Sequence, residues 1–250
     1  MSELIAETRS PQQALDDQAI HLWLLSLDAD AETLEASHKR LSTEEQQRAS
    51  RFLSEPARQR FVLTRSALRR ILHCYAPSLP QPAPLAAGEF GKPFLDTGRT
   101  ANALSFNVSH AGNRALLGFC RGTELGVDVE QERDLPELMG IARRVFSDRE
   151  YAWLEARSVE ERAIPFFRLW TCKEAALKSE GRGFHRDPST LSLAELLEDE
   201  DPTTRRFDQE GLTVAWVRPD DGYPLAWATR MDTPLSVRWI QPASRQRGLR

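Results

Sequence analysis

The order of apolar patterns along the chain limits its fold more than any single motif does. A continuous apolar run, IHLWLLSL at residues 20–27, predicts a strand buried on both faces. Helical patterns follow between residues 42 and 75, where Ser42 and Glu45 form a predicted capping box. Strand patterns return in ALSFNVSH, RALLGFC and LGVDVE, and we expect the last two to pair as a hairpin closed at RGTE.

A second helical block and a second strand block complete the pattern. Residues 136–178 have helical character, and strand patterns recur in LTVAWVRP, PLAWATR and LSVRWI. The order of strand, helices, strands, helices and strands predicts an α+β fold with two similar α/β halves. Each half is expected to hold a small, largely antiparallel sheet packed by helices, and the halves are expected to be residues 1–112 and 113–250.

Charge is distributed unevenly, and this bears on the ligand. The net charge of −4 argues against a general nucleic-acid binder. Residues 39–70 nevertheless contain nine Lys or Arg and three Glu, so the rest of the chain is strongly acidic. A basic island on an acidic protein indicates a local anion site. A pair of helices with solvated Arg side chains is an equally weighted alternative.

Features of membrane and secreted proteins are missing from the sequence. No apolar run approaches the roughly 18 residues of a membrane span, and the start, MSELIAETRSPQQ, lacks the regions of a signal peptide. Cys74, Cys120 and Cys172 have neither disulfide-framework nor zinc-site spacing. We therefore expect a cytoplasmic protein that binds neither membrane nor nucleic acid.

Two carboxylates in GVDVE are the first candidates for chemistry. Strand spacing points Asp128 and Glu130 to one face, where two like charges are costly unless a cation lies between them. Oxygen ligands alone favour Mg²⁺ or Mn²⁺ over zinc. For an isolated pair of this spacing, a strand end whose carboxylates face water is the more frequent explanation.

The stretch FFRLWTCKEAALKSEGRGF, residues 166–184, predicts a helix whose inward stripe becomes charged halfway along. On helical spacing one face carries Phe166, Phe167, Trp170, Lys173, Glu174, Leu177 and Lys178. Partly buried charges need partners, and a metal with a phosphate would provide them. The alternative is an exposed Glu174–Lys178 pair. His110 and Lys92 are weaker candidates, since a lone His is more often structural and GKP is a short motif.

Taken together, five collinear motifs resemble one family. GKPFL, FNVSHAG, GVDVE, FSDREYAWL and RLWTCKEAALKSEGRGF, in this order, are similar to the surfactin-type 4′-phosphopantetheinyl transferases. The resemblance runs from about Ser42 to Phe184. The length is similar to that of the long single-chain class, which is a pseudo-dimer of two α/β halves related by a pseudo-two-fold axis.

The resemblance implies a site, residue by residue. The metal ligands for Mg²⁺, or Mn²⁺, would be Asp128, Glu130 and Glu174. Catalysis would involve Glu174, Lys178 and His110. Coenzyme A would be bound by Arg48, Arg60, Arg65, Gly91, Lys92, Pro93, Asn107, Ser109, His110, Lys173 and Lys178. Arg48 matches a basic position that holds the 3′-phosphate, and Glu45 stands where some members have a second base, so Arg60 or Arg65 is the expected replacement.

The implied reaction is transfer of 4′-phosphopantetheine from coenzyme A to a serine of an apo acyl or peptidyl carrier protein, with release of 3′,5′-ADP. The resemblance also implies a monomer. Two other functions stay open at this point. One is a non-catalytic coenzyme A-binding regulatory protein, and the other is a Mg²⁺-dependent nucleotide pyrophosphatase.

Overall fold

The computed structural model describes residues 15–16, 19–88, 91–97, 102–180, 186–197, 204–207, 210–218, 222–230 and 236–240. Its helices are α1 (Ala31–Lys39), α2 (Thr43–Ser50), α3 (Glu55–Tyr75), α4 (Leu138–Val145), α5 (Asp148–Glu155) and α6 (Ala163–Glu180). Its strands are β1 (Ala19–Ser26), β2 (Leu85–Ala87), β3 (Pro93–Leu95), β4 (Leu104–Ala111), β5 (Arg114–Arg121), β6 (Leu125–Val129), β7 (Thr204–Phe207), β8 (Leu212–Val217), β9 (Leu225–Thr229) and β10 (Ser236–Ile240). The N-terminal segment and residues 181–184 of the helix motif, on which the sequence makes predictions, lie outside the described residues.

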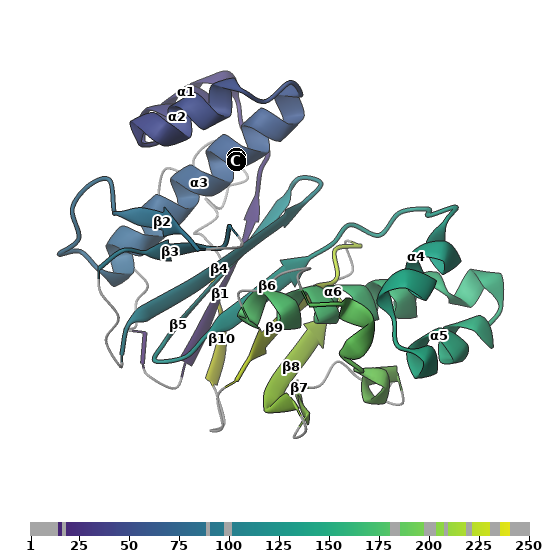
Figure 1. Ribbon diagram of the computed structural model, residues 1–250. Helices are drawn as coiled ribbons and strands as arrows, with labels where there is room; N and C mark the ends of the chain where they lie inside the picture. Colours follow the sequence, from purple (N-terminus) through teal and green to yellow (C-terminus); the bar gives the residue numbers. More distant parts are fainter. Residues whose placement is uncertain are drawn as a thin grey trace, which may run out of the picture.

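Two four-stranded sheets repeat one strand arrangement. The first sheet has the order β10-β1-β5-β4, and the second has the order β6-β9-β8-β7. In both, an opening strand, β1 or β6, is followed by helices. A later strand, β5 or β9, pairs antiparallel both with the opening strand and with the strand that precedes it in the chain, β4 or β8. Helices α3 and α6 therefore occupy equivalent places in the two halves (Figure 1). The predicted α+β fold with two similar, largely antiparallel halves is confirmed.

The final described strand departs from this repeat. β10 runs parallel to β1 along the outer edge of the first sheet, with Ala19 opposite Ser236 and Trp23 opposite Ile240. The C-terminal part of the chain thus completes the sheet of the N-terminal half. β1 itself is buried along most of its length, as its continuous apolar run predicted.

Buried side chains arrange the elements in four layers. On β5, Ala115, Leu117 and Phe119 face α3, whereas Leu116 and Cys120 face the second sheet. The far side of the second sheet is covered by α6, with α4 and α5 packed against it. The order of layers is α3, first sheet, second sheet and α6.

Gly126 sets how closely α6 approaches the second sheet. A Cβ atom at this position would lie 1.9 Å from the carbonyl oxygen of Ala175 and 2.4 Å from the amide nitrogen of Ser179. Both neighbours are helix backbone, so any side chain would displace the helix from the strand. The glycine therefore brings the last turns of α6 directly over β6.

The predicted hairpin at RGTE is wrong. Both edges of β5 are already taken by β1 and β4, and β6 pairs instead with β9 in the other sheet. The short turn consequently joins two sheets that pack face to face. The division expected after residue 112 stays a prediction; it falls in the turn between β4 and β5. Among the described residues, no helix has the length and apolarity that crossing a membrane requires.

Candidate functional site

The edges of the two sheets meet where β4 faces β6, and this contact gathers polar side chains. On β4, Phe106 and Val108 pack toward α3, which leaves Asn107 and Ser109 on the opposite face. The side-chain oxygen of Asn107 accepts a 3.0 Å hydrogen bond from the amide of Val127 on β6. Asn107 thereby satisfies a backbone donor on the edge of β6, and it is almost fully buried.

A buried carboxylate lies at the centre of this contact. Asp128 is 2% exposed, and its Oδ1 accepts hydrogen bonds from Ser109 Oγ at 2.7 Å and from Lys178 Nζ at 2.5 Å. Lys178 Nζ also donates to Ser109 Oγ at 3.1 Å. Ser109, Asp128 and Lys178 come from β4, β6 and α6, so the triangle connects both sheets with the helix that covers one of them.

The charge on Lys178 is stabilised by the carboxylates around it. Burial works against the ammonium ion, but Asp128, Glu174 and Glu130 outweigh it and raise the pKa of Lys178. Burial raises the pKa of Asp128, although Lys178 and Ser109 oppose that effect. The two residues are therefore best described as one ion pair with Ser109 as a shared partner.

Two further carboxylates lie on the same side of the second sheet. Glu130 accepts a 2.8 Å hydrogen bond from Nε1 of Trp170, and burial and the negative charge of Asp128 raise the pKa of Glu130. Burial raises the pKa of Glu174 to about 7, and Asp128 and Glu130 add to this increase while Lys178 opposes it. Trp170, Glu174 and Lys178 are spaced by four residues and form one stripe of α6.

The chemistry of these donors fits a hard divalent cation. All three carboxylates offer oxygen only, and Oδ2 of Asp128 is buried without a hydrogen-bond partner. Burial is the main cause of the raised pKa values of Glu130 and Glu174, and repulsion from Asp128 adds to both; a cation between the carboxylates would relieve that repulsion. As placed, the described His, Cys, Asp and Glu side chains form no cluster of three that encloses an ion.

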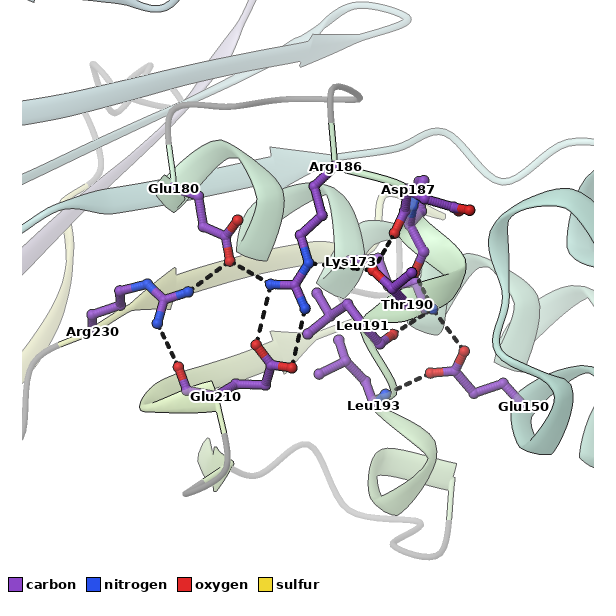
Figure 2. Close-up of polar contacts among 11 residues, drawn as sticks. Glu150, Lys173, Glu180, Arg186, Asp187, Thr190, Leu191, Leu193, Glu210 and Arg230 are labelled. Carbon is purple, nitrogen blue, oxygen red and sulfur yellow. Dashed lines mark hydrogen bonds and ion pairs between the residues drawn. The ribbon is translucent and has the colours of Figure 1, made fainter.

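Lys173 does not join this group, in contrast to the predicted stripe. Its ammonium group is buried and lies 2.7 Å from Oε2 of Glu150 on α5 (Figure 2). It also donates to the carbonyl oxygens of Pro188 at 2.8 Å, Leu191 at 2.6 Å and Val145 at 3.2 Å. These acceptors occupy all of its N–H donors. The structure separates Lys173 from the other predicted coenzyme residues and assigns it to the packing of α6.

The end of α6 is held by a second ion-pair network. Arg186 reaches Glu180, the last residue of α6, at 2.7 Å and Glu210 at 3.1 Å (Figure 2). Arg230 also reaches Glu180, at 2.6 Å. Residues 186–197 are thus tied both to the end of α6 and, through Lys173 and Glu150, to α5. The helix stripe that carries Glu174 and Lys178 is supported from its opposite side.

A basic surface lies on α2 and α3. The guanidinium carbons of Arg48 and Arg65 lie 5.2 Å and 5.8 Å from the ring centre of Phe61, one stacked from each helix. Glu45 is 3.5 Å from Arg65 and 2.6 Å from Arg69, so it is neutralised inside the protein. Glu45 is thereby compensated by two arginines from α3.

His110 and Arg60 connect the basic surface with Lys178. His110 is exposed at the end of β4, and Arg60 and Lys178 are near enough to disfavour its positive charge. Partial burial of the ring among protein atoms has the largest effect and lowers the pKa of His110, and the two positive charges lower it further. Arg60 makes no ion pair with another described residue, and an anion placed here would meet Arg60, His110 and Lys178 together.

The GKP motif lies at the start of β3. Lys92 Nζ is 3.0 Å from the carboxylate of Glu124, which precedes β6. It is 3.2 Å from the carbonyl oxygen of Leu125, the first residue of β6. Gly91 has a positive φ of 80°, a conformation that favours glycine, and Pro93 begins the strand. The turn is therefore fixed against the second half of the chain.

Sequence reasoning missed Glu150, Trp170 and Phe61 as partners of the charged groups. Glu150 is fully buried and accepts hydrogen bonds from Lys173, Ser147 and Leu193. The i, i+4 spacing from Trp170 to Glu174 places both on one face of the helix, and this was a usable signal that Trp170 lies near the carboxylates and could contact Glu130. The same i, i+4 spacing relates Phe61 to Arg65 on α3 and was a usable signal for that contact, whereas nothing in the sequence indicated that Arg48 of α2 lies on the same ring.

Comparison with known proteins gives a consistent set of similarities. Residues 28–119 match the family profile described as 4′-phosphopantetheinyl transferase, N-terminal, and residues 124–228 match that of the 4′-phosphopantetheinyl transferase superfamily. The 4′-phosphopantetheinyl transferase HetI of Nostoc sp. is 36% identical over 175 residues, which cover 70% of this chain and 74% of the relative. The 4′-phosphopantetheinyl transferase psf-1 of Bacillus pumilus is 32% identical over 76% of this chain and 79% of its own. The transferase ffp of Bacillus subtilis is 28% identical over 80% and 87%.

Proposed function

Since the chain belongs to the 4′-phosphopantetheinyl transferase superfamily, we propose that it transfers the 4′-phosphopantetheine group of coenzyme A to a serine of an apo carrier protein. In this reaction a bond forms between the serine oxygen and the pantetheine-side phosphorus. The bond from that phosphorus to the bridging oxygen of the pyrophosphate breaks, and 3′,5′-ADP leaves. The serine proton passes to a base or to water.

The observation that carries the proposal is the contact of Lys178 with Asp128 and Ser109 at the meeting point of the two sheets. Negative charge grows on the departing phosphate during the reaction, and preorganised cations lower the energy of such a state. We assign that role to Lys178 and His110, which are near enough to influence each other's charge. Glu174 is the candidate to accept the serine proton, directly or through a water molecule.

Coenzyme A binding is assigned to the first half of the chain. Arg48, stacked on Phe61, would hold the 3′-phosphate, with Arg60 or Arg65 as the second base. Lys92 with its GKP neighbours, and Asn107 with Ser109, would line the nucleotide. The fixed position of Lys92 against Leu125 supports a preformed site.

Magnesium, or manganese, would be held by Asp128, Glu130 and Glu174, and when bound it would neutralise the pyrophosphate of coenzyme A. The unpaired Oδ2 of Asp128 supports this assignment. Two neighbours would orient these ligands: Trp170 donates a hydrogen bond to Glu130, and Ser109 donates one to Asp128.

The carrier protein is proposed to dock on α4 and the segment before it. Arg143 and Arg144 are exposed there and would pair with acidic residues of the carrier, while Leu135, Leu138 and Met139 are half-buried beside them. We further propose that the enzyme works as a monomer in the cytoplasm, because one chain supplies both halves of the site.

Incubation with labelled coenzyme A, Mg²⁺ and a panel of apo acyl and peptidyl carrier proteins tests the proposal. Mass spectrometry of the carriers should show a phosphopantetheine adduct on the serine, and Asp128→Ala should give none. Coenzyme A binding without an adduct on any carrier would indicate the regulatory alternative. Hydrolysis of coenzyme A without a carrier, at a rate equal to that with one, would indicate the pyrophosphatase.

A further inference from the structure

A cavity of about 460 Å³ lies between α1, α3 and the segment that follows α3. Ligand sites commonly have volumes of roughly 300–1,000 Å³, so a small organic molecule would fit. The lining residues are Lys39, Arg40, Leu41, Arg69, Arg70, His73, Cys74, Leu79, Pro80, Gln81, Pro82 and Ala83. We call this cavity the α1–α3 cleft. We propose that the α1–α3 cleft binds a small phosphate monoester with an apolar substituent.

Charge is the first argument for this ligand. Lys39, Arg40, Arg69, Arg70 and His73 line the cleft, and no Asp or Glu is among its lining residues. Burial lowers the pKa of Arg70, and the positive charge of Arg40 lowers it further. Like charges held at one cavity repel, and a bound dianion relieves that repulsion. Arginine pairs are also well shaped for phosphate, because each guanidinium offers two parallel donors.

The cations of the cleft differ in how firmly they are already engaged. The side chain of Arg69 is held in place, since its guanidinium donates to Glu45 at 2.6 Å and to the carbonyl oxygen of Ala83 at 3.1 Å. Lys39 pairs with Glu35 at 2.7 Å, but both side chains are about 70% exposed, 72% and 69%. Such an exposed pair contributes little stability and is easily exchanged. Lys39, at the end of α1, is thus able to turn toward a ligand. The exposed guanidinium of Arg40 donates to the carbonyl oxygen of Ala36 at 3.1 Å through one nitrogen, which leaves its other donors for a ligand.

The apolar part of the ligand follows from the other residues that line the cleft. Leu41, Leu79, Pro80, Pro82 and Ala83 face the same cavity as the cations. A free inorganic phosphate would leave this apolar surface in contact with water. A monoester with an aromatic or aliphatic group would cover it and gain the corresponding burial energy.

The cleft is separate from the proposed coenzyme site. None of the residues assigned to coenzyme A, the metal or catalysis lines it. The Glu45–Arg69 pair lies between the two regions, because Glu45 contacts Arg65 on one side and Arg69 on the other. α1 and the C-terminal end of α3 also lie in a different part of the molecule from α6 (Figure 1).

Calorimetric titration with phenyl phosphate at low ionic strength tests the proposal, with inorganic phosphate and phenol as the two partial ligands. Phenyl phosphate should bind more tightly than either. Arg40→Gln and Arg70→Gln should each weaken it roughly tenfold, the effect of losing one hydrogen bond to a charged group. Because Arg40 is exposed, Arg40→Gln should retain the fold. If Arg70→Gln does not fold, the result for Arg40→Gln decides the test.

Arg48→Ala is the matched control, because it removes one arginine from the coenzyme surface instead. Binding that persists in Arg48→Ala and weakens in Arg40→Gln supports the cleft. Binding that is lost in Arg48→Ala, displaced by saturating coenzyme A, or unchanged in both cleft variants overturns it. No binding, or binding no tighter than that of inorganic phosphate, overturns it as well. The carrier-labelling assay does not involve phenyl phosphate, so failure of the proposed transfer activity is recognised separately.

Discussion

The ammonium group of Lys178 lies 2.5 Å from Oδ1 of Asp128, while Oδ2 of the same carboxylate is buried without a hydrogen-bond partner. One carboxylate thus has a satisfied oxygen and an unsatisfied one. The satisfied oxygen fixes the end of α6 to β6. The unsatisfied oxygen costs free energy in the unliganded protein and is available to a cation.

Removing the Lys178 charge should affect the reaction more than coenzyme binding. Lys178→Met keeps the aliphatic stem and helix propensity, so we expect a large fall in kcat with little change in the KM for coenzyme A. Interactions made mainly in the transition state lower kcat in this way. Steady-state kinetics against a fixed carrier protein measures the effect, and Lys178→Arg should recover part of it. A variant with normal kcat and a raised KM would assign Lys178 to ground-state binding.

Removing the Lys173 charge should instead lower stability. Lys173→Met leaves Glu150 buried without its countercharge, which costs about 3–5 kcal/mol. Urea unfolding should show this loss, and Lys173→Met combined with Glu150→Gln should recover part of it because no buried charge remains. If Lys173→Met unfolded like the wild type but bound coenzyme A poorly, its assignment to packing would be wrong.

Divalent cations should be required for transfer. Treatment with a chelator should abolish activity, and Mg²⁺ or Mn²⁺ should restore it. Asp128→Ala should lower the rate about a thousandfold, which corresponds to about 4 kcal/mol of transition-state stabilisation. Radiolabel transfer to a carrier protein measures both effects. Full turnover in the chelated enzyme would contradict the metal role of Asp128, Glu130 and Glu174.

Arg48→Ala should raise the KM for coenzyme A and leave kcat nearly unchanged. The variant should lose little with dephospho-coenzyme A, which lacks the 3′-phosphate that Arg48 is proposed to hold. Phe61→Leu is a matched control, because it removes the ring beneath Arg48 and Arg65 without removing a charge. Equal losses with both substrates would exclude the 3′-phosphate as the partner of Arg48.

The contribution of His21 to stability should fall as the pH decreases below about 6.5, while Glu174, whose pKa is raised to about 7, contributes in the opposite direction, so the comparison of wild type with a His21 variant isolates it. His21 is buried, its Nδ1 is 2.8 Å from the Tyr75 hydroxyl, and its Nε2 has no partner. Burial lowers the pKa of His21, Arg238 lowers it further, and Asp16 opposes them. Below pH 6.5 the unfolded chain therefore gains a proton that the folded chain does not.

The His21 contribution to stability is complete above that pH and is lost as the pH falls toward the lower folded pKa. The slope is at most about 1.4 kcal/mol per pH unit. Urea unfolding between pH 7.5 and 5.5 measures it, and His21→Asn, which does not titrate, should flatten it. An unchanged slope in His21→Asn would show that another group causes the decrease.

The parts of this structure that local patterns determine were predictable. Strand spacing predicted that Asp128 and Glu130 share one face, and both contact α6 there. The capping box of Ser42 with Glu45 is present as predicted. Each of these depends on residues within four positions of one another.

The errors concern partners that are distant in sequence. α6 is covered both by the second sheet and by residues 186–197, so it has no single apolar face. Periodicity therefore did not reveal that Lys173 and Lys178 have different neighbours. The turn at RGTE looked like a hairpin because the occupied edges of β5 were unknown. The pairing of Glu45 with Arg69, 24 positions away, was hidden for the same reason.

The parallel pairing of β10 with β1 has a consequence for synthesis. β1 is made long before β10, so the first sheet lacks its outer strand until synthesis has passed residue 236. A nascent chain that has emerged only as far as α6 exposes an unpaired strand edge at β1, the type of edge that invites aggregation. Truncation before residue 236 therefore endangers the N-terminal half of the protein, although every residue of that half is still present.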